Sequence, residues 1–419
     1  MKGFLRILLL GILLGIVLTS SGCGGGGDSI NPPDALAPTD VVQPLAFPGP
    51  YAVACTNIAQ DFSQIPADGD VNDYWEGRGS YVTDLLEDPD NTLIASVTAP
   101  MDSTLYGSFT GDEIEVAVIV CYPTTADNPR PDYQLPTGEV VPHMQTGLDL
   151  PLFADDSESY PVIVFSHGYG NSPISSEAYF TALSSLASHG YVVIAPFHGD
   201  FRFSDLKIDN IGDSIDIASN LDDFTAMQAL RPLAISAALT LVLEDPQWQG
   251  HLDETRIGGF GASMGGETMM LLDGASLTTS YFDIGASSKQ VTTDLRIKAA
   301  VGYVPYFGQA ILPAFGRNQQ GLDNVTLPFL GISGTADTVA PISEVETGMS
   351  RLTGTRELIS LEGVEHGFDV ASTNDIFTWA LMFLDAELNG NQATKTQLST
   401  MASVAGGGDD RVVVFYNGL

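Results

Sequence analysis

Residues 256–266 are the most informative part of the chain for its fold, and they read Arg256-Ile257-Gly258-Gly259-Phe260-Gly261-Ala262-Ser263-Met264-Gly265-Gly266. Residues 256–260 predict a short strand, and residues 266–272, after the turn, predict a helix. Small residues at 261, 262, 265 and 266 let the two backbones approach closely and hold Ser263 on a sharp turn between them. Such a turn projects a serine hydroxyl from the end of a strand, as a nucleophile requires. The alternative interpretation is a glycine-rich turn that carries a surface serine.

The sequence before this turn predicts a parallel strand–helix–strand unit. Pro161-Val162-Ile163-Val164-Phe165-Ser166 is apolar enough for a strand buried on both faces, which is typical of parallel sheets. Ser175 or Ser176 is expected to begin a helix that continues to His189, and residues 191–195 form the next buried strand. A connection of this kind between strands of one sheet is a right-handed crossover.

A candidate acid and a candidate base follow the serine in the order that the α/β-hydrolase fold uses, which is nucleophile, acid, histidine. His366 is the only histidine C-terminal to Ser263, so it is the only candidate general base in that order. Asp337 comes just after a predicted strand over residues 327–333 and is expected to accept a hydrogen bond from His366 Nδ1. The alternative for Asp337 is a helix-capping or turn aspartate. Two weaker candidates for the acid lie on the histidine's own loop, Glu365 and Asp369.

These motifs resemble two groups of serine α/β-hydrolases. Phe165-Ser166-His167-Gly168 and Leu186-Ala187-Ser188-His189-Gly190-Tyr191-Val192-Val193 are similar to the pattern of platelet-activating-factor acetylhydrolases and dienelactone-hydrolase-like esterases. Ser263-Met264-Gly265-Gly266 and Asp337-Thr338-Val339-Ala340-Pro341 are similar to bacterial polyester (cutinase/PET) hydrolases. The resemblance covers about residues 110–390. It implies an α/β-hydrolase fold, with a mostly parallel central sheet and helices on both faces.

The resemblance also implies roles for residues around the nucleophile. The backbone N–H groups of Tyr169 and Met264 are expected to form the oxyanion hole, and His167 is expected to be structural rather than catalytic. Tyr306 falls where the polyester hydrolases have a tryptophan that lines the substrate cleft. Tyr169, Met264 and Tyr306 are therefore expected to line the cleft here. Ala262 and Tyr306 depart from the polyester-hydrolase pattern and predict a looser slot.

An acidic insertion, rich in Asp and Ser, separates the second strand of this unit from the next helix. Residues 201–227 are expected to form a lid over the cleft. The helix after it is expected to open near Arg231 and Pro232, because proline is tolerated in a first turn, and to stop before Pro246.

The N-terminus predicts export. Lys2 and Arg6 precede an apolar run over residues 7–18, which is too short to span a bilayer and is typical of a signal peptide over residues 1–22. Cys23 follows small residues, and a glycine tether comes after it, so the pattern resembles a bacterial lipobox and predicts lipidation of Cys23. Ser20 departs from that pattern, because leucine is usual there. Secretion without a lipid is the alternative.

The rest of the chain divides by composition into a tether and linker over residues 23–50, an N-terminal extension over 51–110 and an α/β-hydrolase domain over 111–419. The two other cysteines of this exported chain, Cys55 and Cys121, predict a disulfide, with two separate buried thiols as the alternative. The formal net charge of −36 argues against nucleic-acid binding. No residue pattern predicts a metal or cofactor, and none implies a protein partner.

The sequence therefore predicts an exported serine carboxylic ester hydrolase of the bacterial cell envelope, either lipid-anchored or secreted. Its expected substrates are short- and medium-chain esters, with aliphatic polyesters or lipids as further candidates. Two alternatives remain open at this point. They are a serine peptidase on the same scaffold and a catalytically silent envelope binding protein.

Overall fold

The computed structural model describes residues 38–145, 150–206, 220–280, 288–309, 312–367, 372–406 and 410–416. The predicted signal peptide over residues 1–22 and the predicted lipidation site at Cys23 lie outside these residues. The predicted tether and linker, residues 23–50, is described only from residue 38 onward.

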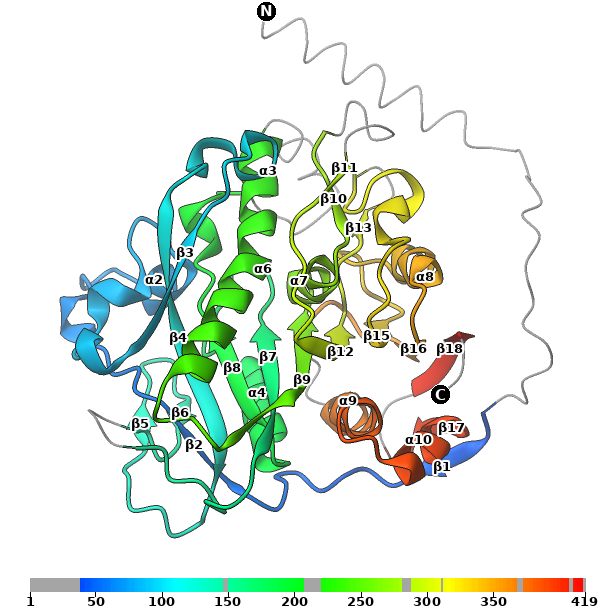
Figure 1. Cartoon of the computed structure of the whole chain (residues 1–419), viewed down its shortest axis with the longest axis horizontal. Helices are drawn as coiled ribbons and strands as arrows, with labels where there is room; N and C mark the ends of the chain where they lie inside the picture. Colours follow the sequence, from blue (N-terminus) through cyan, green and yellow to red (C-terminus); the bar gives the residue numbers. More distant parts are fainter. Residues whose placement is uncertain are drawn as a thin grey trace, which may run out of the picture. The chain divides into compact units, whose positions relative to one another are not determined.

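A mixed sheet of ten strands forms the centre of the fold (Figure 1). Its main path runs through β18 (Asp410–Tyr416), β16 (Arg356–Leu361), β15 (Phe329–Gly334), β12 (Ile297–Tyr303), β9 (Leu252–Ala262), β7 (Tyr160–Ser166), β8 (Val192–Pro196), β4 (Glu113–Thr124) and β2 (Ala52–Cys55), while β3 (Leu93–Thr98) pairs with the first half of β4. The strands from β8 to β16 along this path run parallel, whereas β4, β2, β3 and β18 pair antiparallel with their neighbours. The predicted mostly parallel sheet is confirmed.

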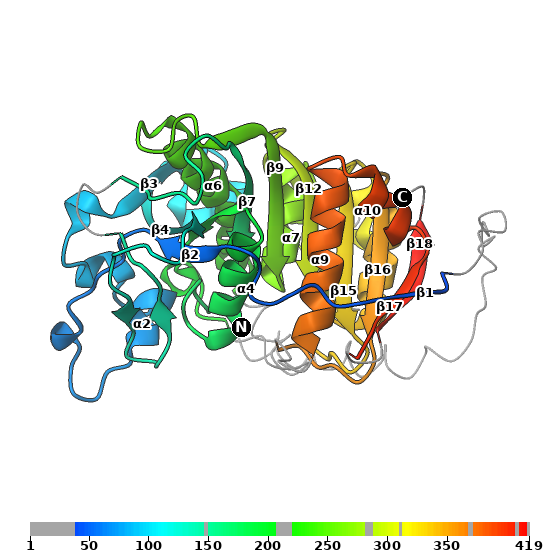
Figure 2. The same ribbon diagram turned by 90° about the horizontal axis from the view of Figure 1, so that it is seen from below.

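Helices cover both faces of this sheet (Figure 1 and Figure 2). An apolar cluster is buried on each face. The described helices are α2 (Val71–Glu76), α3 (Ser103–Tyr106), α4 (Glu177–Ser188), α6 (Leu221–Glu244), α7 (Met264–Leu272), α8 (Ile342–Arg351), α9 (Thr373–Glu387) and α10 (Gln392–Leu398). Side chains of α6, α7 and α8 belong to one cluster, and those of α4, α9 and α10 to the other. Because both faces are covered, β7 is buried along its whole length, as its continuous apolar sequence predicts.

Four two-stranded sheets complete the described part of the chain. They are β1 (Asp40–Val42) with β17 (Met401–Val404), β5 (Tyr133–Gln134) with β6 (Val140–Val141), β10 (Ser276–Thr278) with β11 (Ser288–Gln290), and β13 (Gly308–Gln309) with β14 (Leu312–Pro313).

The helix α6 differs from the prediction. It begins at Leu221, about ten residues before the predicted start, and Pro232 lies in its interior. Pro232 lacks the N–H of a regular helical hydrogen bond, but most of α6 is buried, so packing outweighs this loss. Helix α6 is also long and apolar enough to pass a test for a membrane span, as buried core helices often do. Residues 221–227 of the predicted lid belong to α6, and residues 207–219 lie outside the described part.

The residues predicted as an N-terminal extension are part of the central sheet. Strands β2 and β3 both lie in the range 51–110 and pair with β4, so the predicted boundary at 111 separates no structural units. Strand β1, inside the predicted linker, pairs with β17 near the end of the chain. The predicted disulfide is present, and it joins Cys55 to Cys121 directly across the β2–β4 pair.

Candidate active site

Ser263 stands between β9 and α7 with a backbone that few residues adopt. Its φ is +53° and its ψ is −117°, an unfavourable conformation for any residue except glycine. The turn closes only because its neighbours are small. A Cβ on Gly261 would lie 2.1 Å from the carbonyl oxygen of Gly265, and a Cβ on Gly265 would lie 1.9 Å from that of Ser166. The strand, sharp turn and helix predicted around Ser263 are thus all present.

The end of β12 and the residues just after it hold the backbone of Ser263 on both sides. The Ser263 N–H donates to the carbonyl oxygen of Tyr303 at 2.8 Å, and the N–H of Tyr306 donates to the carbonyl oxygen of Ser263 at 3.0 Å. Between them, Val304 has a φ of +40°, which is rare for a β-branched residue. These contacts compensate for the unfavourable backbone of Ser263.

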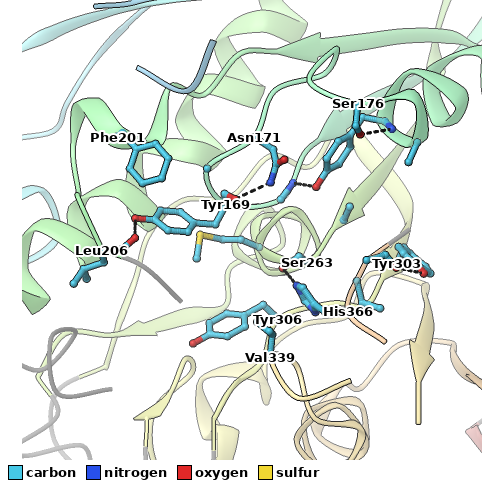
Figure 3. Close-up of a pocket in the computed structure, with 18 of the residues that line it drawn as sticks. Tyr169, Asn171, Ser176, Phe201, Leu206, Ser263, Tyr303, Tyr306, Val339 and His366 are labelled. Atoms are coloured by element: carbon cyan, nitrogen blue, oxygen red, sulfur yellow. Dashed lines mark hydrogen bonds between the residues drawn. The ribbon is translucent and has the colours of Figure 1, made fainter. Parts of the chain in front are cut away.

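The structure brings the three predicted side chains together, and Figure 3 shows two of them, Ser263 and His366, joined by a hydrogen bond. Ser263 Oγ lies 2.8 Å from His366 Nε2, and His366 Nδ1 lies 2.8 Å from Asp337 Oδ2. All three residues follow the carboxyl ends of parallel strands, namely β9, β15 and β16. Side chains from distant parts of the sequence converge at this edge of such sheets.

Asp337 is held rigidly by the turn after β15. Its Oδ1 accepts hydrogen bonds from the N–H groups of Val339 and Ala340, both at 2.8 Å, and its side chain is fully buried. The loop of His366 is fixed in turn by Tyr303, whose hydroxyl donates to the carbonyl oxygen of Gly367 at 2.7 Å. Glu365 is exposed, and Asp369 lies outside the described residues.

This geometry determines which nitrogen of His366 carries the proton. An ionised carboxylate only accepts hydrogen bonds, so the proton of the neutral imidazole is on Nδ1, facing Asp337. His366 Nε2 is then free to accept the Ser263 hydroxyl proton as the oxygen attacks a carbonyl carbon. Asp337 would stabilise the imidazolium that forms.

The two predicted oxyanion donors lie beside the serine. An added Cβ on Gly168 would be 3.5 Å from the Cβ of Ser263, so the loop after β7 is close to the hydroxyl. The N–H groups of Tyr169, in that loop, and of Met264, at the start of α7, donate to no acceptor among the described residues. Both are therefore available to an oxygen bound next to Ser263.

A cavity of about 740 Å³ opens at Ser263 and His366. Tyr169, Met264 and Tyr306 all line it, together with Ala262. The hydroxyl of Tyr169 is turned away from the serine and donates to the carbonyl oxygen of Leu206 (Figure 3). The full described lining is Arg78, Gly168, Tyr169, Gly170, Asn171, Ser176, Ala178, Tyr179, Phe201, Leu206, Ala262, Ser263, Met264, Tyr303, Val304, Tyr306, Val339, His366 and Gly367.

The electrostatic character of this cavity differs from that of the whole chain. The described lining contains no acidic residue, although the protein has 52 of them. One guanidinium reaches the cavity, that of Arg78, and it lies 3.3 Å above the ring of Phe201. Among the described residues, no group of three or more His, Cys, Asp or Glu could hold a metal ion.

The sequence did not predict two buried charged residues that contact the loop after β7, residues 167–170. Asp200 and Arg231 are 1 % and 2 % exposed and form an ion pair with a 3.4 Å separation between Oδ1 and Nε. Asp200 follows β8 as Asp337 follows β15, so an aspartate just after a buried strand marked both positions in the sequence. Arg231 stands in a long apolar stretch, where a charged residue indicates either a helix end or a buried partner.

Comparison with known families supports this description for part of the chain. The family model described as platelet-activating factor acetylhydrolase, isoform II, matches residues 143–204. The match contains β7, the loop with Tyr169, α4 and β8, and it ends before Ser263. No curated protein matches the chain. The matched segment is thus similar to a family of α/β-hydrolase type that hydrolyses ester bonds.

Proposed function

We propose that this protein is a serine carboxylic ester hydrolase that works through an acyl-enzyme. Ser263 is the nucleophile, His366 the general base and then the general acid, and Asp337 the group that orients the imidazole. The Tyr169 and Met264 N–H groups bind the oxyanion. Attack of Ser263 Oγ on the ester carbonyl carbon expels the alcohol, which takes the proton from His366. A water molecule then attacks the carbonyl carbon of the acyl-enzyme as His366 takes its proton, and His366 returns that proton to Ser263 Oγ as the carboxylic acid leaves.

The strongest support for ester hydrolysis is the arrangement of the three side chains. Two hydrogen bonds of 2.8 Å connect Ser263, His366 and Asp337 in series, at the floor of a cavity. A Gly-rich structural turn would require neither bond, nor a nucleophile held in a strained backbone. The similarity of residues 143–204 to an ester-hydrolysing family supports ester chemistry over peptide chemistry.

The size and the lining of the cavity favour uncharged esters of moderate size as substrates. Its walls near the serine carry Tyr169, Met264 and Tyr306, which favour apolar acyl groups. Ala262 leaves room beside them. We infer that short- and medium-chain soluble esters are the best substrates, and that aliphatic polyester chains are better accepted than poly(ethylene terephthalate).

We also propose that the protein is exported and held at the cell envelope by a lipid on Cys23. The support is the sequence of residues 1–27 alone. Mass spectrometry of the protein from its native membrane tests this: a lipid mass on an N-terminal Cys23 is expected, and an unmodified N-terminus beyond residue 23 contradicts it.

Assays with p-nitrophenyl acetate and butyrate, run beside a chromogenic peptide, test the proposed activity. The wild-type protein should hydrolyse the esters and not the peptide. Ser263→Ala and His366→Ala should each reduce kcat by about 10⁴-fold or more, and Asp337→Asn by about two to four orders of magnitude. Peptide cleavage without ester cleavage would favour the peptidase, and the absence of both would favour a binding protein. Full ester hydrolysis by Ser263→Ala would eliminate the mechanism.

A further inference from the structure

The loop that follows β7 leaves one of its backbone polar groups without a protein partner. Three peptide units connect residues 167 to 170, and they contain three N–H groups and three carbonyl groups. Five of the six have partners: His167 O with Arg231 Nη2 at 2.5 Å, Gly168 N–H with Tyr179 Oη at 3.0 Å, Gly168 O with His167 Nδ1 at 2.8 Å, Tyr169 O with Asn171 Nδ2 at 2.9 Å, and Gly170 N–H with Asp200 Oδ2 at 2.9 Å. The sixth, the Tyr169 N–H, has none among the described residues.

The direction of the Tyr169 N–H follows from the bonds on the other side of its peptide unit. In a trans peptide the C=O and the N–H point in opposite directions. The carbonyl oxygen of Gly168 is bound on the buried side by His167 Nδ1, with Arg231 Nη2 3.4 Å away. The Tyr169 N–H must therefore point away from Arg231, and the loop lies beside Ser263.

The Asp200–Arg231 ion pair holds this loop from both of its ends. Arg231 comes from α6 and donates to the carbonyl oxygen of His167, while Asp200 follows β8 and accepts from the N–H of Gly170. The two side chains also face each other at 3.4 Å. The Gly168–Tyr169 peptide lies between these two contacts, so its rotation would break at least one of them.

The position of the proton on His167 is consistent with this arrangement. Burial, together with the nearby charge of Arg231, lowers the pKa of His167 well below its usual value, so the imidazole is neutral. Its Nε2 accepts a hydrogen bond from the N–H of His198 at 3.1 Å. The single imidazole proton is therefore on Nδ1, where it is donated to Gly168 O.

Stability alone does not account for a buried ion pair at this place. Removing two charges from water costs several kcal/mol per ion, and apolar side chains of similar volume are often at least as stabilising. Asp200 Oδ1 and the Nε and Nη1 atoms of Arg231 have no hydrogen bond among the described residues, so the pair is incompletely satisfied. Neither residue lines the cavity, so neither contacts substrate.

We propose that Asp200, Arg231 and His167 are positioning residues, which fix the Gly168–Tyr169 peptide so that its N–H meets the oxyanion formed at Ser263. The inference rests on the proposed ester hydrolysis. Donors bound to Gly168 O also polarise the peptide and strengthen the N–H at its other end. A preorganised donor stabilises the charge that develops in the transition state more than it stabilises the uncharged substrate. Loss of the three residues should therefore lower kcat and leave KM almost unchanged.

The double variant Asp200→Leu/Arg231→Met separates positioning from stability, because it removes both charges and leaves neither one unpaired. We expect a folded protein whose melting temperature is lowered by the loss of the hydrogen bonds to His167 O and Gly170 N–H, but not by an unpaired buried charge. Its kcat on p-nitrophenyl butyrate should fall by about 10²–10³-fold, with KM within about threefold. A trifluoromethyl ketone forms a charged adduct with the serine, and its affinity should fall in parallel with kcat. The affinity of the matched methyl ketone should not change.

The pair His167→Asn and His167→Gln tests the same inference without altering a charge. The amide nitrogen of asparagine can occupy the position of Nδ1 and donate to Gly168 O, whereas the longer glutamine places its amide near Nε2. His167→Asn should retain kcat within about threefold, and His167→Gln should lose at least about tenfold. This pair also decides the question if the double variant fails to fold.

Equal kcat in the two histidine variants, or wild-type kcat in the folded double variant, would overturn the inference. A loss of kcat with no loss of trifluoromethyl ketone affinity would overturn it as well. The failure of the proposed function is distinguishable, because it would be seen as ester hydrolysis that persists in Ser263→Ala or is absent from the wild type.

Discussion

At the scale of single residues, the strained backbone of Ser263 makes a prediction that concerns stability. Its φ of +53° and ψ of −117° suit glycine, which adopts them without steric cost. Ser263→Gly and Ser263→Ala should both be inactive, but the glycine variant should be more stable by about 1 kcal/mol, because only alanine retains the strain. Urea denaturation of the two variants measures this. An alanine variant as stable as the glycine variant would mean that the nucleophile is unstrained.

Glu357 predicts a dependence of stability on pH that is unrelated to the active site. Burial raises its pKa to about 8 from an ordinary 4.5, and neither carboxylate oxygen has a hydrogen-bond partner among the described residues. Between these values the folded state holds a proton that the unfolded state has lost. The contribution of Glu357 to stability therefore decreases as the pH rises through this window.

Replacement by a residue that cannot ionise should remove this effect. Relative to the wild type, Glu357→Gln should gain free energy of unfolding as pH rises from 5 to 8, by roughly 1 kcal/mol per pH unit. Denaturation at pH 5, 6.5 and 8 measures the change, with the exposed Glu254→Gln as the matched control. A difference independent of pH would show that Glu357 ionises normally in the folded protein.

At the scale of elements, the segment from β1 to β2 attaches the start of the described chain to two helices on one face of the sheet. Its Leu45 N–H donates to Thr378 Oγ1 of α9, and its Gly49 N–H donates to Ser188 Oγ of α4. In Figure 2 this segment crosses the sheet face that α4 and α9 cover. Composition predicted a linker here, because prolines and short side chains dominate it, and composition does not report contacts with distant helices.

The segment should be sensitive to a single methyl group at Gly49. An added Cβ would lie 2.4 Å from the carbonyl oxygen of Ser188, a backbone atom that cannot move easily. Gly49→Ala should therefore lower the melting temperature by several degrees and leave kcat/KM unchanged, since Gly49 does not line the cavity. Differential scanning fluorimetry and the ester assay measure both quantities. An unchanged melting temperature would show that the segment is not packed against α4.

Local sequence predicted the elements that carry the proposed chemistry. Ser263 and Asp337 each follow a strand that the local sequence predicts, and the order of nucleophile, acid and histidine along the chain selected His366. The strand β16 before His366 was not predicted. The start of α6 was missed because Asp222 and Asp223 resemble a loop and Pro232 resembles a first helical turn. Arg231 and His167 are 64 residues apart in sequence, and no local pattern predicts their contact.

At the scale of the whole molecule, the disulfide joins parts of the sheet that are 66 residues apart in sequence. In the unfolded chain such a crosslink closes a long loop, and it typically stabilises the folded state by about 2–4 kcal/mol. The variant Cys55→Ala/Cys121→Ala should lose roughly this free energy of unfolding and retain its kcat/KM. Treatment of the wild type with a reductant is the matching control. If neither change alters stability, the crosslink does not constrain the unfolded chain.

The distribution of charge over the molecule also relates to the site. The formal net charge of the protein is −36. The described lining of the cavity nevertheless contains no Asp or Glu, and its one guanidinium is that of Arg78. An acidic surface favours solubility, and salt screens the repulsion between its charges. An acid-free cavity spares the oxyanion at Ser263 from direct repulsion by a neighbouring carboxylate.

The proposed mechanism requires that Ser263 be acylated because His366 and Asp337 activate it. A fluorophosphonate probe, followed by mass spectrometry of the intact protein and of its peptides, tests this most directly. We predict one adduct per molecule, located on Ser263, absent from Ser263→Ala and formed at least about 10³-fold more slowly in His366→Ala. An adduct on another residue of the active protein, or equally fast labelling of His366→Ala, would mean that His366 does not activate Ser263 as the nucleophile.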